Sequence, residues 1–449
     1  MLLREPIRVK TFAHGVHPPE HKQATERKPV ERMALAPELV ILLSQHIGAP
    51  AVAAVDKKQQ VARGELIASA GGFVSVPMHA PATGVVAKID LAPAASGAMT
   101  PAVFLKTDPE ADQTIPDPGE LRDIDALGPS EIVEAVQETG MVGLGGAAFP
   151  THVKMAVPKG KTIDTVIANG CECEPYLTTD HRLMLEQHAD LFRGIRMALK
   201  ATGAERAIIA VEANKPDAVE TLRAATPGDL PIEVAVVKTK YPQGAEKVLI
   251  KALLGREVPS GGLPSDVSCA CFNVATLAQL GYLVPRRQGL IERIVTVTGP
   301  GVERPGNYVI PIGTRLRFVL EQVGCGDAAR LVILGGPMMG PAVSSLDVPV
   351  TKGVSGILVL TEAEVAVRQR ETYPCIKCGQ CVQACPLYLN PSLLGALARK
   401  GEYQAMEEKF HLNDCFECGC CAYVCPSSIP LVQHFRMAKA MNRKRKKGK

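Results

Sequence analysis

Eight cysteines in the last quarter of the chain occur in two runs with the same spacing. The runs are CIKCGQCVQACP at 375–386 and CFECGCCAYVCP at 415–426. Each follows the pattern C-x2-C-x2-C-x3-C-P, with which bacterial proteins bind a cubane [4Fe–4S] cluster. Two copies therefore predict two clusters. The predicted ligands are Cys375, Cys378, Cys381, Cys385, Cys415, Cys418, Cys421 and Cys425.

The order of the ligands follows from the same pattern. In such double motifs the fourth cysteine of each run binds the cluster of the other run, so Cys425 is predicted to complete the first site and Cys385 the second. Four-cysteine zinc sites are the disfavoured alternative, because they use pairs of cysteines rather than two evenly spaced triplets. Cys420 lies between ligands and is interpreted as a spare thiol.

Length and composition fit a globular protein of several domains. A chain of 449 residues with 46% hydrophobic side chains has enough apolar material for roughly three or four domains. No window supplies the ~20 uninterrupted apolar residues that a membrane span needs, and the first residues lack the apolar core of a secretory signal. We therefore expect a cytoplasmic protein whose remaining cysteines are reduced.

The basic charge is concentrated at the C-terminus. The formal net charge is +4, yet residues 436–449 alone contain eight Lys and Arg side chains and no acid. Such a block is either a solvated, disordered end or a segment that contacts anionic lipid or an acidic partner, and the sequence leaves both open. Nucleic acid is not expected as a partner, because no binding motif accompanies the tail.

The N-terminal part is predicted to be an extended arm, residues 1–30, followed by a small β domain, residues 31–110. Short apolar runs punctuated by Gly and Pro predict short strands joined by tight turns. The pairing of VARGELIA with HAPATGVVAKI resembles the barrel-sandwich domains of biotinyl and lipoyl carriers. The hairpin tip at 77–79 has no lysine to carry a cofactor, so we expect a structural or docking domain.

A mainly parallel α/β domain is predicted for residues 118–285, because helical and strand patterns alternate along it. Its glycine-rich loop, which begins at Gly140, has the backbone freedom to hold a phosphate, although such loops are also common as tight turns. A buried strand then ends in Asn169, which is followed by Glu172 and Glu174. Polar groups at the carboxyl end of a strand lie where open α/β sheets bind ligands.

Two further domains complete the predicted fold. Residues 286–363 contain strand patterns around a helix and are predicted to form a β-grasp-like domain, in which the loop at 335–343 is interpreted as a structural turn without a charged partner. Residues 364–435 form a largely α-helical cluster domain, which the basic tail 436–449 follows. The expected fold class is multidomain α/β, with barrel-sandwich, Rossmann-like α/β, β-grasp-like and helical twin [4Fe–4S] ferredoxin domains in chain order.

Four segments of the α/β domain resemble the flavin- and NADH-binding subunit of respiratory complex I. GLGGAAFPTHVK at 143–154 resembles its G-x-G-G-x-x-F-P-T-x-x-K loop, and NGCECEP at 169–175 resembles its N-A-D-E-x-E-P run. YPQGAEK at 241–247 and FNVATL at 272–277 resemble its Y-x-x-G-E-E-T and N-N-V-E-T-L segments. With HGVHPPEHK at 14–22 and the flanking domains, nearly the whole chain resembles the C subunit of the Rnf electron-transport complex.

This resemblance implies non-covalent FMN as a cofactor and NAD(H) as a substrate. The residues that it implies around FMN are Gly143, Gly145, Gly146, Lys154, Asn169, Glu172, Tyr241, Gly244, Asn273 and Thr276. On the nicotinamide side it implies Phe149, Glu174 and Glu246. The sequence departs from the complex I pattern at Leu144, Cys171 and Ala245, where that family has arginine, aspartate and glutamate.

The function implied by the resemblance is that of a peripheral subunit on the cytoplasmic face of the cell membrane. NADH would give hydride to FMN, and single electrons would pass through the two clusters to other subunits of a membrane complex. Such complexes couple NAD(H) and ferredoxin or flavodoxin to an ion gradient. Two alternatives stay open, namely a soluble cobalamin reductase of the same domain order and a non-enzymatic iron–sulfur relay with an inactive flavin site.

Overall fold

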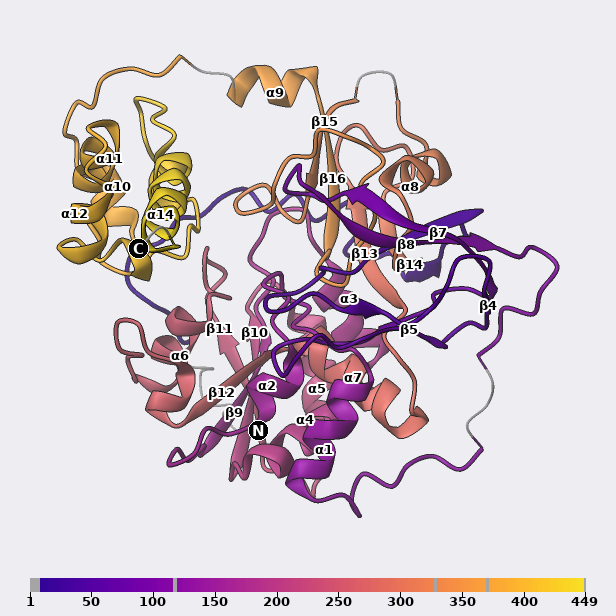
Figure 1. The fold of residues 1–449 in the computed structure, drawn as a ribbon. Coiled ribbons are helices and arrows are strands. Elements are labelled where there is room, and N and C mark those ends of the chain that lie inside the picture. The colour runs from indigo at the N-terminus through magenta and orange to yellow at the C-terminus, as the bar shows by residue number, and fades with distance from the viewer. Residues whose placement is uncertain (1–8, 116–118, 327–328, 369–370, 448–449) are drawn as a thin grey trace.

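The structure, a computed structural model, describes residues 9–115, 119–326, 329–368 and 371–447 (Figure 1). These residues form a barrel-sandwich domain, an α/β domain, a β-grasp-like domain and a helical cluster domain in chain order. The predicted multidomain α/β fold class is therefore confirmed. The first eight residues of the predicted arm and the last two of the predicted tail lie outside the described residues.

The barrel-sandwich domain consists of two small antiparallel sheets, with the strand orders β2-β8-β7-β4 and β3-β5-β6. Successive residues of β2 face opposite sides of its sheet, so Leu39 and Ile41 enter the main core while Val40 and Leu42 join a smaller cluster. The strands are β2 (Glu38–Leu42), β3 (Val52–Ala53), β4 (Gln60–Val61), β5 (Leu66–Ser69), β6 (Met78–His79), β7 (Gly84–Pro93) and β8 (Met99–Thr107).

The α/β domain has a four-stranded parallel sheet in the order β11-β10-β9-β12. The middle of each strand is apolar because both faces are covered: Val166 and Ala168 face the larger core, whereas Ile167 faces the smaller. The elements are α1 (Pro129–Glu138), α2 (Thr151–Met155), β9 (Thr165–Gly170), α3 (Thr179–Glu186), α4 (His188–Thr202), β10 (Arg206–Glu212), α5 (Pro216–Ala225), β11 (Ile232–Val237), α6 (Glu246–Leu254), η1 (Pro264–Val267), β12 (Cys269–Asn273) and α7 (Val274–Arg286).

The β-grasp-like domain has a five-stranded mixed sheet in the order β1-β14-β13-β16-β15. Its edge strand β1 comes from the N-terminal part of the chain and runs parallel to β14. A second core lies under this sheet and includes Leu316, Val319 and Leu320 of the helix α8. The elements are β1 (Val30–Arg32), β13 (Glu292–Thr298), β14 (Gly306–Pro311), α8 (Leu316–Val323), β15 (Ala329–Leu334), β16 (Gly356–Thr361) and α9 (Glu362–Arg368).

The cluster domain is helical and stands beside the rest of the chain (Figure 1). Its elements are α10 (Gln380–Ala384), α11 (Pro391–Arg399), α12 (Tyr403–Glu408), η2 (Leu412–Asp414), α13 (Cys420–Tyr423) and α14 (Leu431–Lys447). The interpretation of the basic segment as a disordered end is wrong for residues 436–447, because α14 continues through them. Its cations pair with acids of the same domain: Arg436 and Lys439 lie 2.8 and 2.9 Å from the Glu417 carboxylate. Among the described helices, none combines the length and the apolar content needed to cross a bilayer.

The N-terminal arm, here residues 9–28, runs across the α/β domain and touches the cluster domain (Figure 1). The amide of Lys10 donates to the Val236 carbonyl at 3.1 Å, and the backbones of Val16 and Tyr241 exchange two hydrogen bonds of 2.9 and 3.0 Å. The Gly15 amide donates to the Ala384 carbonyl at 3.1 Å. The arm therefore packs on two domains of its own chain.

A buried lysine lies where three domains meet. Lys352 of the β-grasp-like domain is 1% exposed, and its ammonium donates to the carbonyls of Pro77 at 2.8 Å and Gly140 at 2.7 Å. Those carbonyls belong to the barrel-sandwich and α/β domains. Because burial disfavours the charged form, the pKa of Lys352 is lowered to about 7.

This lysine predicts a pH dependence of stability. Between pH 7 and the ordinary lysine pKa of 10.5, the unfolded chain binds a proton that the folded chain has lost. The free energy of unfolding is therefore expected to rise with pH in this interval, by about 1 kcal/mol per pH unit. The nearby His46 and His79 do not compete, because burial lowers the pKa of each and both are neutral there. Urea unfolding at pH 7, 8 and 9 should show this slope, and Lys352→Met should lose it; equal slopes in both proteins would contradict the prediction.

Candidate functional site

The loops of the predicted flavin site meet at one edge of the α/β sheet. The chain adds β10 and β11 on one side of β9 and then returns to add β12 on the other side. The carboxyl ends of β9 and β12 therefore form a topological switch point, where open α/β sheets bind their ligands. Asn169 near the end of β9 and Asn273 at the end of β12 are paired directly across this point.

The glycine-rich loop lies beside this switch point and is tied to α7. The Gly143 amide donates to the Phe149 carbonyl at 2.8 Å, which closes the loop, and the Leu144 amide donates to the Thr276 hydroxyl at 2.9 Å. Gly145 packs against Asn273 so closely that a Cβ atom would lie 3.2 Å from the Asn273 Cβ. A side chain at this position would therefore crowd Asn273, and Gly145 and its neighbour Gly146 are exposed.

A second link joins the loops that follow β9 and β11. The side-chain amide of Asn169 donates to the Gly244 carbonyl at 2.8 Å, and its oxygen accepts from the Cys171 amide at 3.0 Å. Gly244 lies so close to the Cys171 carbonyl that a Cβ would be only 2.3 Å away. The segments 169–175, 241–247 and 272–277 therefore lie with the glycine-rich loop at one edge of the sheet.

Glu172 is engaged in capping α3 rather than free. Its carboxylate accepts hydrogen bonds from the Thr179 hydroxyl and the Asp180 amide, both at 2.9 Å. Asp180 was not identified from the sequence, yet its carboxylate accepts from the side-chain amide of Asn273 at 2.6 Å. Burial, together with the charge of Glu172, raises the pKa of Asp180 to about 7. The site therefore contains a carboxyl group whose charge changes near neutral pH.

Lys154 on α2 forms an ion pair with Glu246, the first residue of α6. Burial opposes the charge of Lys154, but the Glu246 carboxylate outweighs burial and raises the pKa of this lysine. The pair is only partly buried, with each side chain 33% exposed. Lys154 therefore stays positively charged and partly exposed, so an anion can compete with Glu246 for it.

Glu174 binds the loop between β15 and β16. Its carboxylate accepts from the backbone amides of Met338 at 3.0 Å and Met339 at 2.9 Å. The interpretation that this loop lacks a charged partner is wrong, because the partner comes from another domain. Burial raises the pKa of Glu174 to about 7, although these two amides oppose the shift. The structure thus joins Glu174 to the β-grasp-like domain.

The three departures from the complex I pattern have a local explanation. Leu144 is 1% exposed and Cys171 is 8% exposed, so both side chains belong to hydrophobic cores. The Cys171 thiol points toward the Ala210 carbonyl at 3.8 Å. Ala245 precedes α6 as its N-cap. Leu144 and Cys171 therefore contribute packing where arginine and aspartate would contribute charge.

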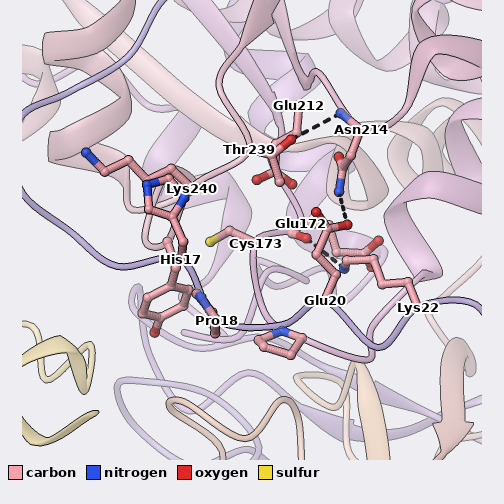
Figure 2. A pocket seen from close by; sticks show the side chains of 12 residues that line it. His17, Pro18, Glu20, Lys22, Glu172, Cys173, Glu212, Asn214, Thr239 and Lys240 are labelled. Atoms are coloured by element: carbon pink, nitrogen blue, oxygen red, sulfur yellow. Dashed lines mark hydrogen bonds between the residues drawn. The ribbon is translucent and has the colours of Figure 1, made fainter. Parts of the chain in front are cut away.

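A small cavity lies between the arm and the ends of β9, β10 and β11. It has a volume of about 90 Å³, and Figure 2 shows Glu20, Glu172, Glu212 and Asn214 around it. The Asn214 amide donates to the Glu20 carboxylate at 2.6 Å. Glu212 is 1% exposed and pairs with Lys215 through one oxygen at 2.9 Å, whereas its other oxygen has no partner among the described residues. A cavity of this size and polarity has room for water.

Lys22 fastens the arm to the loop after β9. Its ammonium is almost completely buried and donates to the carbonyls of Glu172 at 2.9 Å, Glu174 at 3.0 Å and Leu177. Apart from the HGVHPPEHK segment itself, no signal in the sequence pointed to this contact. The arm therefore holds in place the same loop that supplies Glu172 and Glu174.

The groups of the glycine-rich loop, α2 and the loop after β11 suit FMN. Gln243, which was not identified from the sequence, is fully buried in the loop after β11, and neither of its amide atoms has a partner among the described residues. Such an amide can donate and accept at once, as the polar edge of a flavin ring requires. Gly146 has open space where a Cβ would be, and Lys154 supplies a cation. The donor set therefore fits a flavin phosphate.

The predicted ligands form two groups of cysteines. We name Cys385, Cys415, Cys418 and Cys421 the inner group and Cys375, Cys378, Cys381 and Cys425 the outer group. Burial raises the pKa of Cys415, and the neighbouring Cys418 and Cys385 add to this shift. Burial likewise raises the pKa of Cys381, to which Cys425 and Cys378 contribute. The fourth cysteine of each run is thus close enough to a cysteine of the other run to affect its pKa, and the exchange of fourth ligands stays a prediction.

The inner group adjoins the predicted flavin site. The Tyr241 hydroxyl donates to the Cys418 carbonyl at 2.7 Å, and the Tyr241 ring is 1% exposed. Tyr241 also opens the loop that contains Gly244. Among the described residues, no three His, Cys, Asp or Glu side chains form a site for a single metal ion. The loop after β11 therefore contacts the sheet edge through Gly244 and the loop of the inner group through Tyr241.

Family models match four consecutive parts of the chain. The RnfC barrel sandwich hybrid domain matches residues 10–110, and the Nuo51 FMN-binding domain matches residues 136–281. The SLBB domain matches residues 294–342, and the 4Fe–4S dicluster domain matches residues 374–429. These matches follow the domain order seen in the structure.

Similar proteins match along nearly the whole chain. The C subunit of the proton-translocating ferredoxin:NAD(+) oxidoreductase complex of Clostridium ljungdahlii is 41% identical over 97% of this chain and 94% of its own. The C subunit of the Na(+)-translocating complex of Acetobacterium woodii is 42% identical over 88% of this chain and 89% of its own. The NAD+-reducing [NiFe]-hydrogenase in the H2-reduced state shares the fold, with a TM-score of 0.54 at 21% identity over 72% of this chain and 64% of its own. The chain therefore belongs to the RnfC family, the C subunits of ion-translocating ferredoxin:NAD(+) oxidoreductase complexes.

Proposed function

We propose that this chain is the subunit of an Rnf complex that exchanges hydride with NAD(H) at FMN and passes single electrons through two [4Fe–4S] clusters. The observation that carries the proposal is that one loop, which begins at Tyr241, joins both sites: its Gly244 carbonyl accepts from Asn169 at the sheet edge, and its Tyr241 hydroxyl donates to the Cys418 carbonyl. A donor site and an electron carrier that one loop joins are close enough to work in series. The subunit itself then performs the oxidoreductase step.

The site residues inferred from the sequence are proposed in the same roles. The glycine-rich loop, Asn169, Gly244, Asn273 and Thr276 are linked to one another at the switch point and would surround the flavin. Lys154 would exchange its partner Glu246 for the flavin phosphate. Phe149 offers a flat face on the nicotinamide side. Glu172 and Glu174 would act mainly by holding α3 and the loop at Met338 in place.

When bound, FMN supplies the conversion between two-electron hydride chemistry and one-electron transfer. The chain's own residues provide position and electrostatics: Lys154 neutralises phosphate charge, and the Asn169 and Thr276 bonds keep the loops in register. Buried Tyr241 excludes water between the sheet edge and Cys418. The partners are the other subunits of a membrane-associated complex, and ferredoxin or flavodoxin is reached through them. We place the chain at the periphery of that complex, on the cytoplasmic face.

The alternatives are less well supported. The similar proteins named above are C subunits of ferredoxin:NAD(+) oxidoreductase complexes, which does not support a soluble cobalamin reductase. A relay with an inactive flavin site does not account for the exposed glycine-rich loop beside a charged lysine. The buried, unpartnered amide of Gln243 also indicates a site that expects a polar ligand.

Anaerobic purification with iron, sulfide and released-flavin analysis tests this proposal. We expect about eight irons and about one FMN per chain, and bleaching of both chromophores on titration with NADH. Iron without flavin and without a response to NADH would overturn the flavin assignment and leave a relay.

The charge of Asp180 predicts a pH dependence of FMN binding. Above pH 7 its carboxylate is ionised beside Asn273 and Gly145, where it repels a bound phosphate. Affinity for FMN is therefore expected to fall as pH rises through about 7, and Asp180→Asn should bind FMN about tenfold more tightly at pH 8. The nearby charges of Glu172, Arg293 and Lys215 remain in the variant.

Fluorescence titration of the apoprotein measures this effect. Riboflavin, which lacks the phosphate, serves as the control ligand, and its affinity should be the same in Asp180→Asn and in the unmodified protein. An equal gain for riboflavin and FMN would show that Asp180 acts on the flavin ring or on the fold rather than on the phosphate.

A further inference from the structure

The two groups of cysteines have different surroundings. In the inner group, Cys385 and Cys421 are buried and the Cys418 carbonyl is bonded to Tyr241. In the outer group, Cys375 and Cys378 are exposed. The two predicted clusters are therefore not equivalent, since one is enclosed by the rest of the chain and the other lies at the surface.

The inner group is covered by three other parts of the chain. The α/β domain contributes Tyr241, and the arm contributes Gly15, whose amide donates to the Ala384 carbonyl next to Cys385. The β-grasp-like domain contributes Met338, whose carbonyl would lie 2.9 Å from a Cβ at Gly419. Another protein cannot approach the Cys418 loop through these contacts.

The outer group is surrounded by an ordered but exposed segment. All residues from Glu371 to Cys378 are exposed, including Tyr373 at 56% and Ile376 at 68%. Their backbone is nevertheless fixed, because the Tyr373 amide donates to the Ser427 carbonyl at 3.0 Å. Exposed aromatic and aliphatic side chains on a fixed backbone are typical of a protein interface. We name residues 371–378 the outer segment.

We propose that electrons pass from the flavin site to the inner group and then to the outer group, and that the outer segment is the docking surface for a protein with a one-electron redox centre. This inference rests on the proposed function. Each transfer oxidises the donor by one electron and reduces the acceptor by one, with no bond or proton moved. Reverse flow uses the same order backwards.

The occupant follows from the chemistry of the outer segment. Electron tunnelling decays steeply with distance, so a partner must cover Cys375 and Cys378 to bring its own centre close. A lipid surface fits less well, because anionic lipid attracts clustered cations and this segment has one acid, Glu371, and one base, Lys377. The partner is therefore a redox subunit of the same complex rather than the bilayer.

The test uses the assembled complex with Ile376→Asp, which places a charge in the proposed contact. We expect flavin, iron content and NADH-dependent reduction of both clusters to remain unchanged, while electron delivery to the other subunits falls at least about tenfold through weaker docking. Leu263→Asp is the matched control, since Leu263 is 62% exposed on the α/β domain, and it should leave both steps intact.

Ile376 lies between the predicted ligands Cys375 and Cys378, so Ile376→Asp could lose iron. Tyr373→Ala is therefore the second variant, and in that case it alone tests whether the outer segment is the docking surface. Unchanged delivery in Tyr373→Ala and in an iron-replete Ile376→Asp would overturn the docking surface. Loss of NADH-dependent cluster reduction in an iron-replete variant would overturn the proposed order. Failure of the unmodified complex to reduce its clusters with NADH would instead refute the proposed function.

Discussion

Replacing Cys418 with serine is expected to remove the inner cluster and leave FMN bound. Serine oxygen is a poor replacement for a thiolate ligand, so the iron content should fall from about eight to about four per chain. NADH should still bleach the flavin, but electrons should no longer reach the outer group, because the centre next to Tyr241 is missing. Iron analysis, flavin release and low-temperature EPR of the NADH-reduced protein measure the three quantities.

Cys420→Ser is the matched control for this change. Cys420 lies two residues away and is fully buried, and a hydrogen bond from its thiol lowers the pKa of the Cys418 thiol. As a spare thiol it should be replaceable without loss of either cluster. Loss of a cluster in Cys420→Ser, or loss of FMN from folded Cys418→Ser, would contradict the ligand assignment.

Replacing Lys154 with alanine is expected to abolish FMN binding while both clusters remain. The change removes the cation of α2 and also leaves the Glu246 carboxylate without this partner, so that a phosphate meets repulsion in place of attraction. Loss of one charge-assisted contact weakens the binding free energy of FMN by about 1.5–3 kcal/mol, and the Glu246 carboxylate weakens it further. The affinity for FMN should therefore fall at least about 100-fold. Flavin content after gel filtration and FMN titration of the apoprotein measure the loss.

Lys161→Ala provides the comparison for Lys154→Ala. Lys161 also forms a salt bridge in the α/β domain, to Asp266 at 2.9 Å, but it precedes the start of β9, whereas Asn169 lies near the other end of that strand. The Lys161→Ala protein should bind FMN with unchanged affinity and keep its iron. Full FMN occupancy in Lys154→Ala would refute the placement of the phosphate.

The sequence predicted those features that are encoded within short segments. Cysteine spacing led to two clusters with exchanged fourth ligands, and the alternation of strands and helices led to the parallel sheet. The roles of Gly145 and Gly244 in binding flavin remain predictions, but a Cβ at Gly244 would lie only 2.3 Å from the Cys171 carbonyl, so the turn there excludes a side chain. Periodicity and turn chemistry are local properties, so they can be identified without knowing how domains pack.

The contacts between domains could not be predicted in this way. Tyr241 and Cys418 are 177 positions apart, and Glu174 and Met339 are 165 positions apart. The local sequence around these residues does not indicate which distant segment each of them contacts. The same holds for Lys352, whose ammonium is bonded to carbonyls of two other domains. The helical form of residues 436–447 was missed because their pairing with Glu407 and Glu417 is also tertiary.

The arm also constrains how the chain matures during synthesis. Its His14 and Gly15 contact Gln383 and Ala384, with a separation of 369 positions for the first pair. The arm leaves the ribosome before the α/β and cluster domains, but the surfaces that receive Lys22 and Gly15 form only after those domains have left the exit tunnel. The arm is therefore made before the domains that hold it and is among the last segments to be fixed in place.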